Sequence, residues 1–186
     1  PDPTPASFAY PVSSTEYATE ENDGDGWYNA QDFGVPNSNF DGKLHLGEDW
    51  NEEVRGDEDG NTDCGLPVYS TSTGTIVYAG EAAPSLGKVV VVRHQLADGS
   101  EVESLYAHLG SISQTSGTVE KREQIGTIGD ADGYYPWCHL HFAIRLPSSP
   151  EWGNPGPGYA TSTDGWTDPS NYIDGNTGAP SGLTAT

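Results

Sequence analysis

The sequence predicts a mainly β protein: a single domain built on an antiparallel or barrel-like β-sheet, with loop-rich extensions at its N- and C-terminal ends. Short runs rich in β-branched and aromatic residues recur from Leu66 onward, and turn signals such as Asp98-Gly99 separate them. In addition, no segment longer than about ten residues shows the periodicity of a helix. The 186 residues are enough for one domain with a substantial core.

The expected strands follow one another through the middle of the chain. They cover residues 66–69, 75–79, 88–94, 101–109, 125–128 and 139–146. We expect them to belong to a core of residues 41–146. Residues 1–40 are interrupted by proline, serine, asparagine and glycine, and residues 147–186 are again rich in glycine and proline. The sequence therefore predicts a loop-rich N-terminal segment and a loop-rich C-terminal extension packed on the core.

The chain is strongly acidic, with 28 aspartate and glutamate residues against 7 lysine and arginine residues and a formal net charge of −21. Such a surface repels phosphates, so we exclude nucleic acid as a partner. It also repels anionic cell-wall polymers at low salt, and high salt relieves that repulsion by shortening the Debye length. Two interpretations stay open: a salt-adapted extracellular protein, or an ordinary acidic secreted protein.

The start of the chain and its hydropathy both bear on location. The sequence begins at Pro1 rather than methionine, either because a secretion signal has been removed or because the sequence starts here. No run approaches the roughly 20 apolar residues of a membrane helix, so we expect no membrane-spanning segment. We expect a secreted or periplasmic protein that is a monomer.

The two cysteines, Cys64 and Cys138, are an even number in a chain that we expect to be exported. This indicates a disulfide, which would close a long loop and contribute about 4 kcal/mol of stability by the chain-entropy relation. The alternative is a pair of free, buried thiols. Because Cys138 directly precedes His139, a disulfide there would also brace that histidine.

Four of the five histidines fall into three short patterns that a metal-dependent hydrolase requires. The patterns are His45-Leu46-Gly47-Glu48-Asp49, Tyr106-Ala107-His108-Leu109 and His139-Leu140-His141-Phe142. His45 and Asp49 are close enough in sequence to bind one ion from a turn or a curved strand end. His139 and His141 are two apart in an expected strand, so both side chains leave the same face. A catalytic zinc takes three protein ligands and leaves one position open, beside which a second histidine is a useful acid or base. Each pattern alone is a weak indication.

In this order and spacing, the motifs resemble the lysostaphin-like zinc metallopeptidases of peptidase family M23. The resemblance runs from about Lys43 to Arg145 and covers more than half of the chain. Besides the three histidine motifs, it includes residues 65–69, 74–80, 90–94 and 124–129.

The resemblance implies a compact antiparallel β fold with a narrow groove and a bound Zn²⁺. It implies that His45, Asp49 and His141 hold the zinc and that His108 and His139 are catalytic, in roles left undivided between them. Family members cut peptide bonds, commonly in peptidoglycan cross-bridges or stem peptides. We therefore expect a zinc metalloendopeptidase whose partner is a peptidoglycan peptide or a glycine-rich peptide substrate. The alternatives are a general extracellular protease for glycine-rich proteins, and a non-catalytic relative that binds the wall or regulates another hydrolase.

Two segments depart from the family pattern. Family members often approach the last histidine motif through glycine, serine and threonine ending in proline, whereas this chain has aromatic residues between Asp132 and Cys138. We expect this aromatic segment to line the groove. The loop from Trp50 to Asp63 is acidic and longer than the family's. Its residues 57–63 loosely resemble a calcium loop but lack the downstream glutamate, so we favour a solvated acidic loop, with a calcium site as the alternative.

Three further residues lie close to the motifs without matching a catalytic role. His94 ends a very apolar strand, and we expect it to be structural or to support a ligand indirectly. We expect Tyr106 and Trp50 to pack in the core, although their positions beside site residues also allow contact with substrate.

Overall fold

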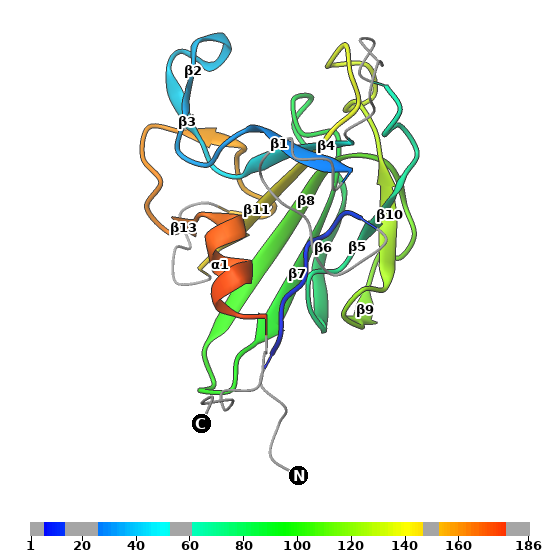
Figure 1. The fold of residues 1–186 in the computed structure, drawn as a ribbon, viewed down its shortest axis with the longest axis vertical. Helices are drawn as coiled ribbons and strands as arrows, with labels where there is room; N and C mark the ends of the chain where they lie inside the picture. Colours follow the sequence, from blue (N-terminus) through cyan, green and yellow to red (C-terminus); the bar gives the residue numbers. More distant parts are fainter. Residues whose placement is uncertain (1–5, 14–25, 53–60, 147–152, 178–186) are drawn as a thin grey trace, which may run out of the picture.

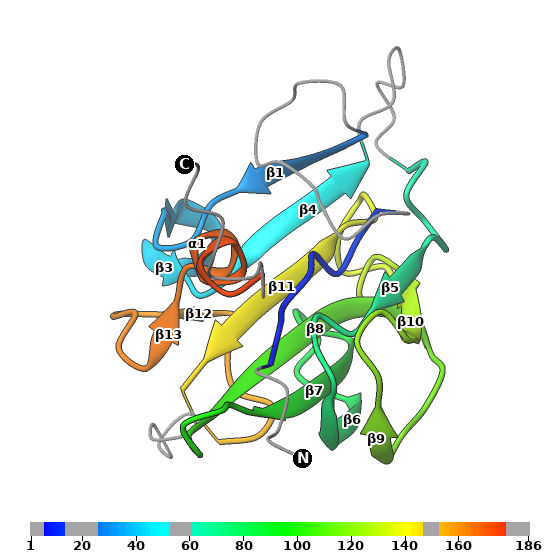
Figure 2. The same ribbon diagram turned by 60° about the horizontal axis from the view of Figure 1, so that its bottom comes forward.

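The computed structural model describes residues 6–13, 26–52, 61–146 and 153–177. Within these ranges, ten strands join one sheet whose pairings are antiparallel, which confirms the predicted fold class. The main path of the sheet runs through β1 (Trp27–Gln31), β4 (Glu48–Glu52), β11 (Leu140–Arg145), β8 (Glu101–Ile112), β7 (Lys88–Gln95), β6 (Gly74–Glu81) and β9 (Gly117–Val119). Figure 2 shows these strands side by side.

The remaining strands are short and lie around this path. β10 (Gln124–Ile128) pairs with β8 and with β5 (Pro67–Tyr69), and β13 (Trp166–Thr167) pairs with β11. A second sheet holds β12 (Tyr159–Ala160), β3 (Lys43–His45) and β2 (Pro36–Asn37), with a 3₁₀ turn, η1 (Ser38–Phe40), after β2. The helix α1 (Pro169–Gly175) lies over one face of the large sheet (Figures 1 and 2). None of the described helices has the length and apolar character that a membrane crossing requires.

The central strands are buried on both faces, which explains their unbroken apolar runs. In β7, Val90 and Val92 belong to the larger core cluster, whereas Val89 and Val91 belong to a second cluster on the opposite face. Successive side chains of a strand point to opposite faces, so a strand covered on both sides needs apolar residues at every position. The strands predicted over residues 75–79, 88–94 and 101–109 are confirmed as β6, β7 and β8.

Both ends of the chain contribute to the larger core. Phe8, Tyr10 and Val12 are buried in it, as is Ile173 of α1. Residues 6–13 run beside the end of β5, where Ala9 N–H donates to the Thr71 carbonyl at 2.8 Å and Tyr69 N–H donates to the Pro11 carbonyl at 2.9 Å. These segments were expected to be loop-rich, and the structure adds β1, β2, β12, β13 and α1 to them. Each has seven residues or fewer, too short for periodicity to reveal it.

The short helix has a local signal that explains where it begins. The side chain of Asp168 accepts a hydrogen bond from the Asn171 N–H at 2.8 Å, and Pro169 occupies the first helical position. Both features favour a helix start because they satisfy or remove backbone donors that lack partners.

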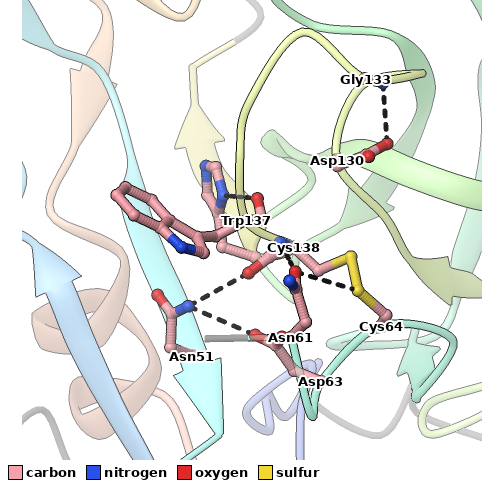
Figure 3. Close-up of a disulfide and its surroundings, with 9 residues drawn as sticks. Asn51, Asn61, Asp63, Cys64, Asp130, Gly133, Trp137 and Cys138 are labelled. Atoms are coloured by element: carbon pink, nitrogen blue, oxygen red, sulfur yellow. Dashed lines mark hydrogen bonds between the residues drawn. A yellow bond between two sulfur atoms is a disulfide. The ribbon is translucent and has the colours of Figure 1, made fainter. Parts of the chain in front are cut away.

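A disulfide joins Cys64 to Cys138, as predicted, and links the segment before β5 to the residue preceding His139. Figure 3 shows the polar contacts around it. Asn61 accepts a hydrogen bond from the Cys138 N–H at 3.2 Å, and Asn51 donates to the Cys138 carbonyl at 3.2 Å and to Asp63 at 3.3 Å. The disulfide therefore fastens the approach to the last histidine motif to the segment before β5, and the hydrogen bond from Asn51 fastens it to β4.

Candidate metal centre

The side chains of His45, Asp49 and His141 converge on one point. The His45 Nε2 atom lies 2.9 Å from His141 Nδ1 and 3.2 Å from Asp49 Oδ1, and His141 Nδ1 lies 3.1 Å from Asp49 Oδ1. All three residues are buried. His45 ends β3, Asp49 is in β4, and His141 is in β11, so three strands bring the donors together.

The turn between β3 and β4 explains how the first two ligands reach the third. Gly47 passes so close to β11 that an added Cβ would lie 2.4 Å from the Phe142 carbonyl oxygen and 3.0 Å from His141 Cε1. Only glycine fits this approach without movement of the backbone. Asp49 then pairs directly with His141 in the β4–β11 ladder.

The triangle of donor atoms fits a small cation. A tetrahedral zinc bound at about 2.0–2.2 Å spaces its nitrogen and oxygen ligands slightly more than 3 Å apart. Burial by itself would raise the pKa of Asp49, but the neighbouring His45 and His141 hold it well below its usual value. Burial lowers the pKa of His141, which favours the neutral imidazole that a metal requires.

Hydrogen bonding also prepares one ligand. The Nδ1 atom of His45 lies 3.2 Å from the Asp32 carbonyl oxygen, so we place the ring proton on Nδ1. The lone pair of Nε2 is then directed to the centre of the triangle, an arrangement common to metal-binding histidines. The Nε2 atom of His141 is buried and has no hydrogen-bond partner among the described residues.

His108 and His139 lie next to this triangle. Their ring centroids are 4.6 Å apart, and that of His108 is 5.5 Å from that of His141. His139 Nε2 lies 3.9 Å from Asp49 Oδ2. The structure therefore gathers all five residues that the sequence singled out as site residues.

A local distortion of β8 directs His108 into the site. Its φ is +61°, and the β7–β8 register shifts between Lys88 and Val90, opposite this position. A bulge of this kind changes the direction of a side chain and is common beside functional sites. The Leu86 carbonyl then holds His108 in place: the His108 backbone N–H donates to its oxygen at 2.9 Å, and Nδ1 of the ring lies 3.3 Å from the same oxygen, which we assign as the acceptor of both.

The environment keeps His108 neutral. Burial lowers its pKa well below the usual histidine value, and His139 and His141 lower it further. With the proton on Nδ1, the Nε2 atom of His108 is free to accept another. His139 has a similar arrangement, because its Nδ1 lies 3.3 Å from the Trp137 carbonyl oxygen.

The aromatic segment before the last motif reaches the site through Tyr135. Its ring centroid lies 4.7 Å from that of His108 and 4.9 Å from that of His139. The Tyr135 hydroxyl donates to the Ser85 carbonyl at 3.0 Å, which anchors the ring. Tyr134 and Trp137 are instead about half exposed.

Sequence reasoning missed Tyr159, which stacks on a ligand. Its ring lies 4.9 Å from the His45 ring and 4.0 Å from the Phe40 ring. The pairing of β12 with β3 puts Tyr159 opposite His45. No sequence motif predicts this contact, because Tyr159 lies 114 positions after His45, in a C-terminal extension without evident periodicity.

The other residues near the motifs have structural positions. His94 lies in the larger core, where its ring nitrogens contact the Thr73 carbonyl at 3.0 Å and Ser104 Oγ at 2.7 Å. Trp50 and Tyr106 are fully buried, in agreement with the packing interpretation. Most of the acidic loop 57–63, for which calcium was the alternative to a solvated loop, lies outside the described residues, because residues 57–60 are not described.

A buried triangle of two imidazoles and a carboxylate, with two more imidazoles alongside, has the groups that a metal-dependent hydrolase needs to bind its ion and move protons. The family of the chain is more specific than this class: the chain belongs to peptidase family M23, whose sequence profile matches residues 58–152. That match contains His108, His139 and His141 but begins after His45 and Asp49, which the fold brings to the same place.

Relatives and solved structures agree with this family. The chain is 38% identical over 86 residues to the DD-carboxypeptidase/endopeptidase Mpg of Neisseria meningitidis, covering 46% of this chain and 19% of that protein. It is 42% identical over 82 residues to the cell division protein DipM of Caulobacter vibrioides, covering 44% of this chain and 13% of that protein. The chain thus spans about a fifth or less of the length of these relatives.

The fold is similar to that of the catalytic domain of the antimicrobial peptidase lysostaphin from Staphylococcus simulans. The TM-score is 0.57 at 22% sequence identity, and the match covers 80% of this chain and 92% of that domain. At this identity the likeness establishes the shared fold.

Proposed function

We propose that the protein is a zinc endopeptidase that hydrolyses peptide bonds in peptidoglycan cross-links or stem peptides. One observation carries the proposal: His45, Asp49 and His141 place three donor atoms 2.9–3.2 Å apart, with His108 and His139 beside them. The donors suit zinc, since imidazole nitrogen and carboxylate oxygen are among its usual ligands. A role confined to binding or regulation would not need this complete set.

Bound zinc would polarise the scissile carbonyl and lower the pKa of a water molecule towards about 7. The residues of the chain then handle protons and charge. One of His108 and His139 accepts the proton of the attacking water on its Nε2 atom and later donates it to the departing amine. The other, which needs a second proton on its Nε2 atom to act as a donor there, hydrogen-bonds to the oxygen that becomes negative, a stabilisation of roughly 3 kcal/mol. The carbonyls of Leu86 and Trp137 hold the two rings in the orientation that these steps require.

Two observations support a substrate in the cell wall. The names of the relatives, a DD-carboxypeptidase/endopeptidase and a cell division protein, point to peptidoglycan. The Cys64–Cys138 disulfide fits an oxidising compartment, so we place the activity outside the cytoplasm.

The proposal is tested by measuring bound zinc and the release of fragments from purified peptidoglycan. His141→Ala is expected to lose both zinc and activity, because one corner of the triangle is removed. His139→Ala is expected to keep most of the zinc while turnover falls at least a hundredfold. Full activity in His141→Ala would contradict the proposal.

His94→Asn is the matched control, since it replaces the one histidine outside the cluster. It is expected to lower thermal stability while folded protein keeps its zinc and its turnover. Digestion of a glycine-rich protein in parallel, with the cut bonds mapped by mass spectrometry, separates a wall hydrolase from a general protease.

A further inference from the structure

A cavity of about 610 Å³ lies directly against the candidate metal centre. Three of its lining residues each contact a different site histidine. The Leu86 carbonyl lies 3.3 Å from His108 Nδ1, and the Tyr159 ring stacks on His45. At Gly158, an added Cβ would lie 3.7 Å from His141 Cε1. A group bound in this cavity would therefore sit next to the histidines.

The walls of this cavity are largely apolar, and most of them come from residues on either side of the family match. Residues 153–159 form one wall, and Ala82 and Ala83 contribute to another. Phe40 and Tyr159, whose rings stack at 4.0 Å, add a flat aromatic surface. Cavities of this size with few polar groups are typical small-ligand or side-chain sites, and the polar groups decide the specificity.

The charged group in this cavity is Lys43. It precedes His45 by two positions on β3, so its Cα lies about 6–7 Å from that of the ligand. Its side chain is exposed. In the part of the chain that the structure describes, it is the one basic residue whose side chain has no hydrogen bond or ion pair.

The other described basic residues are all engaged. Lys88 pairs with Asp132, and Arg93 and Arg145 both pair with Glu103. Lys121 and Arg122 bind oxygen atoms of residues 7–13. In a chain of net charge −21, a free ammonium beside the candidate centre makes a local positive site on a surface that otherwise repels anions.

We propose that this cavity binds a carboxylate-bearing residue of the peptide substrate, with the Lys43 ammonium paired to the carboxylate. The inference rests on the proposed peptidase function and names its substrate class: acidic peptides, such as stem peptides with free carboxylates, rather than neutral glycine-rich chains. The apolar walls receive the carbon skeleton of that residue, and Lys43 selects its charge.

The test uses two pairs of otherwise identical cleavable peptides. One pair ends in a free carboxylate or in an amide, and the other carries Glu or Gln at one internal position, so the two pairs distinguish a terminal from a side-chain carboxylate. The wild-type zinc enzyme is expected to prefer the carboxylate member of at least one pair by about three- to tenfold in kcat/KM. The preference should appear mainly in KM and decrease as NaCl rises, because salt screens exposed charges.

In Lys43→Gln, the ratio of kcat/KM between the carboxylate peptide and its neutral counterpart is expected to fall close to one. Lys121→Gln, which removes one positive charge at a separate cavity, is the matched control and is expected to keep the wild-type ratio. Binding of the preferred peptide to zinc-loaded His139→Ala, with and without Lys43→Gln, gives a readout that does not depend on turnover. There the Lys43→Gln change is expected to weaken binding by a similar factor.

The outcomes separate this inference from the proposed function. If the wild-type zinc enzyme cleaves neither these peptides nor peptidoglycan, the proposed function fails, and the inference with it. If it cleaves both members of each pair equally, or if Lys43→Gln leaves the preference intact, the inference is overturned while the peptidase function stands.

Discussion

Asp49 and His141 lie directly opposite each other in the β4–β11 ladder, and their Oδ1 and Nδ1 atoms are 3.1 Å apart. This cross-strand pair ties the candidate metal centre to the large sheet, while His45 reaches it from the small sheet. A metal bound here would therefore link the two sheets in addition to taking part in catalysis, because its ligands come from both sheets.

Removal of the metal is expected to lower thermal stability. A ligand present at about a thousand times its dissociation constant stabilises the folded state by about 4 kcal/mol. For a chain of this size that corresponds to a fall of about 10 °C in Tm on chelation. Differential scanning calorimetry with and without EDTA measures it. His141→Ala should show little change with EDTA, and an equal shift in that variant would place the stabilising ion elsewhere.

Gly47→Ala is expected to disrupt the candidate centre through the backbone. The new Cβ would lie 2.4 Å from the Phe142 carbonyl, so the β3–β4 turn must move away from β11. We expect a loss of about 1–3 kcal/mol in the free energy of unfolding, together with weaker zinc binding. Urea unfolding and metal titration measure the two effects. Gly175→Ala is the control, since its Cβ would meet nothing within 4 Å. Normal zinc affinity in Gly47→Ala would show that the close approach is unimportant for the site.

Loss of the disulfide is expected to reduce stability and activity together. The bond joins residues 74 positions apart, and the chain-entropy relation gives it about 4 kcal/mol. Replacing Cys64 and Cys138 with serine should lower the urea midpoint accordingly. Activity should also fall, because Cys138 precedes His139. The wild type should respond to reductant and the double variant should not; a reductant effect of equal size in both would contradict this account.

His94 is expected to make stability depend on pH. Burial lowers its pKa from the usual 6.5 to about 4, with Glu103 the neighbouring charge that opposes this shift. In the unfolded chain His94 thus becomes protonated as the pH falls through 6.5, whereas in the folded protein it becomes protonated only near pH 4. The contribution is favourable above pH 6.5 and is lost as the pH falls, by about 2 kcal/mol between pH 7.5 and 5.

A second buried group acts in the opposite direction, so this effect must be measured as a difference between variants. Burial raises the pKa of Asp63 to about 7, and its contribution is therefore present at low pH and lost as the pH rises through 7. Asp63 is present in both the wild type and His94→Asn, so its effect cancels. Urea unfolding should show the advantage of the wild type shrinking by about 2 kcal/mol between pH 7.5 and 5. A constant difference would mean that His94 titrates normally.

The sequence was sufficient to predict the elements whose signals are local. The run Val89–Val92 marks β7 because each of its side chains meets an apolar neighbour on one face or the other. His139 and His141 were expected on one face because a strand alternates with period two. The disulfide followed from the cysteine count and the indications of export.

The tertiary structure decided the features whose cause lies far away in the chain. β1 and β12 form because partner strands are present, and their own sequences are too short to specify them. Tyr159 meets His45, and Leu86 orients His108, only after the chain has folded.

By itself the sequence determined the chemistry available to this protein: which imidazoles and carboxylates exist, and which neighbours share a strand face. Folding decided their convergence, because an ion site depends on distances of about 3 Å between atoms from three strands, and no local spacing encodes such distances. It also placed Lys43 and the C-terminal segment around one cavity, where a charge that is ordinary in the sequence becomes the candidate determinant of the substrate.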